Sequence, residues 1–143
     1  MSNRQRLSLH RLVTLILLVA ITGCGLIDSG NTDCETNPAA AWRASLPLSA
    51  TNVQERCSMN IVNPSYTATF LMSPDDLETF QQSTLIRDWM ADASAAGVFE
   101  SEAAQMESFL VGTYGDGAVA LEVLIDTSDP QQYHVYYDAT YVD

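Results

Sequence analysis

Lysine is absent from this chain of 143 residues, and basic residues of any kind are few. Six arginines stand against 18 acidic residues, which gives a formal net charge of -12 at pH 7. We expect no nucleic-acid partner, because phosphates need Lys or Arg to displace their counterions. Electrostatic docking on anionic lipid is disfavoured for the same reason, and Schiff-base catalysis has no lysine to use. Self-repulsion of the acidic residues predicts a monomer.

Long apolar runs and histidine are also scarce. The apolar run over residues 12–21 spans about 15 Å as a helix, roughly half of a bilayer core of about 30 Å. This length argues against a permanent membrane span.

His134 is the one histidine beyond His10, and no GxSxG, HExxH, P-loop or GxGxxG motif occurs. The sequence therefore predicts no metal site, no cofactor and no enzyme activity.

The charges divide the chain at residue 23. Arg4, Arg6 and Arg11 precede this point without any acidic residue, and all 18 acidic residues follow it. A basic segment, a short apolar run and small residues form the order of a secretory signal. Residues 1–23 are therefore predicted to be a signal peptide, and the absence of a twin-arginine pair favours general secretion.

The segment Ile21-Thr22-Gly23-Cys24 resembles the lipobox of bacterial lipoproteins. This resemblance implies that lipoprotein-processing enzymes attach lipid, typically including palmitate, to Cys24 and cleave after Gly23. It implies an exported protein anchored by its N-terminal lipid in the cell membrane or outer membrane, at the periplasmic or extracellular face. Gly25 stands where an Asp would favour inner-membrane retention, so the family analogy favours the outer membrane. The alternative is an ordinary secretory signal with an incidental cysteine.

Cys34 and Cys57 are the two remaining cysteines. Export compartments permit disulfides, so a Cys34–Cys57 bridge is predicted. Such a bridge contributes roughly 3 kcal/mol in the chain-entropy model. It would join a predicted tether, residues 24–37, to a domain over residues 38–143. Free thiols and a metal site are the alternatives, but a metal needs further soft ligands.

Strand signals lie at both ends of this domain, and helix signals lie between them. The motif Ser73-Pro74-Asp75-Asp76 is typical of a helix start. Ser73 can cap the helix, Pro74 suits its first turn, and the two acids interact favourably with the positive end of the helix dipole. The order predicts one α+β domain, an antiparallel sheet with two or three helices packed on one face. Strands are predicted over 51–62, 65–72, 109–114, 118–126 and 132–141, with further helices over 84–95 and 100–108.

Within this domain, residues 46–53, 66–70 and 73–77 resemble small uncharacterised bacterial lipoproteins. The resemblance supports the fold and implies no activity.

Tyrosine is locally abundant near the C-terminus. Tyr133, Tyr136, Tyr137 and Tyr141 fall within nine residues. Strand alternation places Tyr133, Tyr137 and Tyr141 on one face, and Tyr136 with His134 on the other. Core packing is one interpretation. The other is an aromatic recognition strip, formed by Tyr133, His134, Tyr136 and Tyr137, for an envelope protein or glycan.

These observations favour a lipid-anchored, non-catalytic binding or accessory module of the cell envelope. One alternative is an envelope hydrolase that uses His134 or a carboxylate pair. A second alternative is a structural lipoprotein without a ligand. The carboxylate groups considered are Asp75, Asp76 and Glu78, Glu100 and Glu102, and Asp126 and Asp129. Calcium suits clustered oxygens, but no loop has EF-hand spacing.

Overall fold

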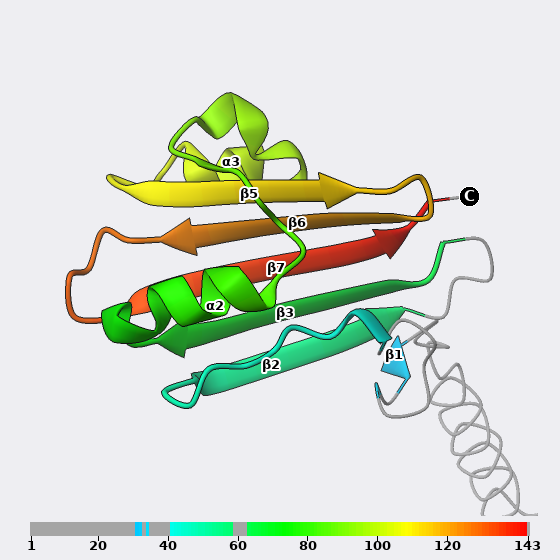
Figure 1. Ribbon diagram of the computed structural model, residues 1–143, viewed down its shortest axis with the longest axis horizontal. Helices are drawn as coiled ribbons and strands as arrows, with labels where there is room; N and C mark the ends of the chain where they lie inside the picture. Colours follow the sequence, from blue (N-terminus) through cyan, green and yellow to red (C-terminus); the bar gives the residue numbers. More distant parts are fainter. Residues whose placement is uncertain (1–30, 33, 35–40, 59–62, 143) are drawn as a thin grey trace, which may run out of the picture.

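The computed structural model describes residues 31–32, 34, 41–58 and 63–142 (Figure 1). These residues form a seven-stranded antiparallel sheet in the order β1-β2-β3-β7-β6-β5-β4. The strands are β1 (Asn31–Thr32), β2 (Thr51–Ser58), β3 (Ser65–Met72), β4 (Trp89–Met90), β5 (Phe109–Gly115), β6 (Val119–Asp126) and β7 (Tyr133–Tyr141). The helices are the 3-10 turns η2 (Pro74–Asp76), η3 (Ala93–Ala95) and η4 (Gly97–Phe99), and the α-helices α2 (Leu77–Ser83) and α3 (Glu100–Ala103). An antiparallel sheet accompanied by helices confirms the α+β class.

The centre of the sheet follows the alternation of the sequence. In β3, Tyr66, Ala68, Phe70 and Met72 are all buried, and the residues between them are half-buried. The predicted hairpin of β6 and β7 is confirmed, with Val119 opposite Tyr141 and Asp126 opposite His134. The predicted pairing of the first two long strands is confirmed as β2 with β3.

Helix α2 packs on the main core through Phe80. The Phe80 ring meets Phe70 edge-on, with the ring centroids 5.6 Å apart. Phe80 is only 1% exposed, and burying a side chain of this kind contributes roughly 1.5–3 kcal/mol. Figure 1 shows α2 lying across β3 and β7. The predicted cap at Ser73 is confirmed for the 3-10 turn η2, which leads into α2, because the Ser73 side chain accepts a hydrogen bond from the backbone N–H of Asp75.

Helix α3 belongs to a second cluster, which contains Ala96, Ala103, Val111 and Leu124. Leu124 lies opposite Val111 across β5 and β6, and its neighbour Ile125 belongs to the main core. Adjacent residues of a strand point to opposite faces, so β6 is buried on both sides. The buried residues of α2 and α3 thus belong to different clusters, which differs from the expectation of one shared face.

The helix predicted over 84–95 is wrong. Thr84 ends α2 in an extended conformation, and the chain then forms β4, in which Trp89 pairs with Gly112. A Cβ at Gly112 would clash with Ile86 and Trp89. Because Gly112 has no side chain, Ile86 and Trp89 can pack directly on β5. This tertiary contact outweighs the helical spacing of apolar residues in the segment. The helix predicted over 100–108 is also shorter, since α3 ends at Ala103.

Candidate functional site

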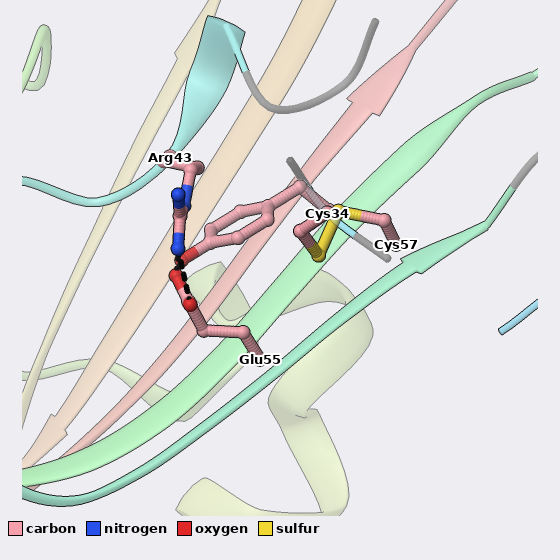
Figure 2. A network of polar contacts seen from close by, with 5 residues as sticks. Cys34, Arg43, Glu55 and Cys57 are labelled. Carbon is pink, nitrogen blue, oxygen red and sulfur yellow. Dashed lines mark hydrogen bonds and ion pairs between the residues drawn. A yellow bond between two sulfur atoms is a disulfide. The ribbon is translucent and has the colours of Figure 1, made fainter. Parts of the chain in front are cut away.

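The disulfide predicted between Cys34 and Cys57 is present, with the two Cα atoms 5.3 Å apart (Figure 2). Next to it, Asn31 and Thr32 pair with the end of β2. The described part of the predicted tether is therefore joined to the sheet. Cys24 and the predicted signal peptide lie outside the described residues, and no helix among those described is long and apolar enough to span a membrane.

A polar network fixes the segment that precedes β2. The Arg43 guanidinium forms an ion pair with Glu55 of β2, with Nε donating to Oε1 at 3.0 Å (Figure 2). Tyr66 is buried, and its hydroxyl donates a hydrogen bond to the same Oε1 at 2.7 Å. The hydrogen bond from Arg43 is the largest cause that lowers the pKa of Glu55. Burial and the bond to Glu55 raise the pKa of Tyr66.

The predicted recognition strip is divided between the two faces of the sheet. Tyr133 and Tyr137 pack with the main core, whereas Tyr136 packs against the second cluster. Tyr137 is 6% exposed, and its ring meets Tyr66 edge-on at a centroid distance of 5.7 Å. Burial raises the pKa of Tyr137 to about 12. The four residues therefore do not form one surface.

His134 and Tyr136 form a pair on the second face. The Tyr136 hydroxyl lies 3.1 Å from His134 Nδ1, and the ring centroids are 4.4 Å apart. Burial lowers the pKa of His134, and the nearby charge of Asp126 partly opposes this shift. Tyr136 also packs against Phe99 at 6.0 Å. Among the described hydrogen bonds, His134 contacts no Ser or Cys nucleophile, so a triad is not assembled here.

Two carboxylates that sequence reasoning missed face each other across β6 and β7. Glu122 lies opposite Asp138, and burial raises the pKa of both. Glu122 accepts hydrogen bonds from the backbone N–H groups of Val98 and Phe99, each at 3.2 Å. Both acids lie eight positions from Pro130 in the turn of the hairpin, and this symmetry is the sequence signal for their pairing.

Glu122 anchors the 3-10 turn η4 to the sheet. Gly97 in this turn has a positive φ of 30°, and a Cβ there would clash with the Glu122 carboxylate. The Glu122 side chain therefore holds this turn against the sheet. Five of the seven acids that the sequence offers for hydrolysis accept hydrogen bonds through their carboxylates. Glu78 accepts from Gln82, Glu102 from Ser101, Asp126 from Ser128 and Asp129 from Gln131, each within a turn or helix, whereas Asp76 accepts from Ser49 in the segment before β2.

A pocket of about 270 Å³ lies on the main face, where the segment before β2 meets the end of α2. We call it the Trp42 pocket. It is lined by Ala41, Trp42, Arg43, Ser45, Ser83, Thr84, Leu85, Val119, Leu121 and Tyr137. The Tyr137 hydroxyl donates to the backbone carbonyl of Trp42 at 2.9 Å, and the Trp42 ring stacks on Tyr141 at 6.1 Å. Strand β7 thereby holds the wall of the pocket.

The chemistry of the Trp42 pocket suits binding. Val119, Leu121 and Leu85 supply apolar surface, Trp42 and Tyr137 supply aromatic rings, and serine and threonine hydroxyls lie among them. No Asp, Glu or His is among the lining residues. Sequence reasoning missed this site, because it is assembled from segments that are distant in the chain and carry no shared motif.

Metal binding has no cluster to use in the part of the chain that the structure describes. No group of three His, Cys, Asp or Glu side chains comes together there. Comparisons with family models, curated proteins and solved structures found no match for this chain.

Proposed function

We propose that this protein is a lipid-anchored binding module of the cell envelope, which holds a small ligand in the Trp42 pocket. The observation that carries the proposal is the pocket itself, which has aromatic and apolar walls and is lined by Arg43, the partner of Glu55 in an ion pair. Concave, mostly apolar sites with a few polar groups are the usual places for small ligands.

Export is supported by the N-terminal sequence and by the disulfide. Disulfides persist in oxidising compartments outside the cytosol, and the Cys34–Cys57 bond fits such a compartment. Cys34 lies ten positions after the proposed lipid site, Cys24. An extended chain of that length reaches at most about 36 Å. In this proposal, Cys34 and the edge of the sheet to which it is bonded therefore lie within about 36 Å of the lipid.

Binding is favoured over catalysis by the separation of the chemical groups. The lining of the pocket supplies hydroxyl groups and Arg43 but no carboxylate or imidazole to move a proton. His134 pairs with Tyr136 on the opposite face of the sheet. A hydrolase that used His134 would work on that face, where Glu122 is engaged with the backbone of η4.

Two tryptophans make the proposal testable, because the chain contains no others. Trp42 lines the pocket and Trp89 lies in β4. Full-length protein labelled with 5-fluorotryptophan, in micelles of a non-glycosidic detergent, would be titrated with cyclohexanol, a small ring with an apolar body. We expect the fluorine signal of Trp42 to shift and saturate while that of Trp89 stays in place. A static Trp42 signal across small ring compounds would contradict the proposal.

A further inference from the structure

We infer that the Trp42 pocket takes an uncharged ring with one apolar face and a hydroxyl-bearing edge, namely one pyranose unit of a neutral glycan. This inference rests on the proposed binding function and specifies its ligand class. The charge, the size and the polar groups of the pocket favour such a ring.

Charge favours a neutral ligand. The chain has 18 acidic residues, yet none lines this pocket. Arg43 is the one charged lining residue, and Glu55 pairs with it. A cation would find no unpaired carboxylate in the lining. An anion would approach against the field of a protein with a formal net charge of -12.

Size and shape favour a single ring. The volume of about 270 Å³ lies just below the range of about 300–1,000 Å³ that is typical of pockets for drug-sized ligands. A pyranose ring presents C–H groups on its face, and this face can lie against apolar and aromatic surface. Trp42, Leu85 and Leu121 provide such surface in the lining.

The polar groups of the lining favour hydroxyls on the ligand. Ser45 has no hydrogen-bond partner among the described residues, and its exposed side chain lines the pocket. Ser83 Oγ donates to the carbonyl of Phe80 at 2.7 Å and keeps lone pairs to accept a further bond. Arg43 uses Nε and Nη2 on Glu55, and Nη1 has no partner among the described residues. A wholly apolar ring would strip water from these groups without replacing its hydrogen bonds.

The same labelled full-length protein tests the inference with three ring compounds. Methyl β-D-glucopyranoside is the neutral sugar. Methyl β-D-glucuronide has a carboxylate in place of its hydroxymethyl group, and cyclohexanol is an all-carbon ring of the same size with a single hydroxyl. We expect both controls to bind at least about tenfold more weakly than the glucopyranoside. Cyclohexanol lacks the hydroxyls that would bond the polar lining groups, and the glucuronide carries a negative charge that the acidic protein repels. The readout is the saturable shift of Trp42 with Trp89 as the internal reference.

The possible results separately test the ligand class, the role of charge and the binding function itself. If cyclohexanol binds as tightly as the glucopyranoside or more tightly, the ligand class is wrong and the pocket remains a binding site. If the glucuronide binds best, the argument from charge is overturned. If no compound shifts the Trp42 signal, the inference and the proposed function both fail.

Discussion

The Tyr137 hydroxyl donates a hydrogen bond to the backbone carbonyl of Trp42 at 2.9 Å, across 95 residues of sequence. Tyr137 lies in the centre of β7, and Trp42 lies in the segment before β2. Because Trp42 forms a wall of the pocket, the last strand of the sheet positions the first part of the domain at the proposed binding site.

Replacing Tyr137→Phe removes this donor and leaves the ring in place. We expect the free energy of unfolding to fall by about 1 kcal/mol, the usual worth of one hydrogen bond. Urea denaturation measures the change. Tyr133→Phe is the matched control, because the Tyr133 hydroxyl has no hydrogen bond among the described residues. Equal losses in both variants would show that the bond to Trp42 does not hold the segment.

The Arg43–Glu55 ion pair predicts a pH dependence of stability. The pKa of Glu55 is lowered in the folded protein, chiefly by the hydrogen bond from Arg43. The stabilisation is therefore present above the ordinary pKa of a glutamate, and it is lost as the pH falls through the lowered folded value. Glu55→Gln removes it, and we expect a loss of about 1 kcal/mol or less at pH 7 because the pair is partly exposed.

Denaturation of Glu55→Gln and of the unaltered protein should be compared between pH 7 and pH 3. Comparing the two proteins cancels the other acids, including Glu122 and Asp138, whose pKa values are raised. We expect the difference between the proteins to shrink towards acid. A constant difference would mean that Glu55 acts through packing alone.

Cys34 and Cys57 should resist alkylation in exported protein until a reductant is added. Reduction should then lower the free energy of unfolding by roughly 3 kcal/mol in the chain-entropy model. Mass spectrometry of alkylated protein counts the modified thiols. Labelling of both thiols without reductant would show that the bond seen in the structure does not form in the envelope.

Cys24→Ser tests the proposed lipid anchor. We expect the variant to lack lipid and to keep residues 1–23, because the serine hydroxyl cannot replace the thiol nucleophile in diacylglyceryl transfer. Membrane fractionation and mass spectrometry of the intact protein give the result, with Ser29→Ala as a matched change nearby. A normally lipidated Cys24→Ser product would overturn the assignment.

His134→Ala should leave ligand binding in the Trp42 pocket unchanged, because His134 lies on the opposite face of the sheet. In the hydrolase alternative, a general base contributes about 10²–10⁴-fold in rate. Complementation of a deletion strain would reveal a loss of that size. Failure of His134→Ala at normal membrane level, with Tyr136→Ala still functional, would favour the enzyme alternative.

Sequence reasoning predicted the elements whose signals are local. The alternation of β3, the cap at Ser73 and the hairpin of β6 and β7 are all present. It failed over 84–95, where the close contact of Gly112 with Ile86 and Trp89 decides the structure. It also missed the Trp42 pocket and the pairing of Glu122 with Asp138. The pocket depends on contacts between distant segments, which no local pattern encodes. The acid pair follows from the register of the predicted hairpin, but alternation alone does not show that η4 covers these acids.

The central claim is that the Trp42 pocket holds a ligand, and one comparison tests it most directly. Ser45→Phe places a ring in the exposed part of the lining, whereas Ser101→Phe makes the same change on the exposed surface of α3. The dissociation constant of methyl β-D-glucopyranoside would be measured for both variants from the fluorine signal of Trp42. We predict that Ser45→Phe weakens binding at least about tenfold, because the ring fills part of the pocket and a hydroxyl is lost. Ser101→Phe should leave binding unchanged. Equal affinities in the two variants would contradict the central claim.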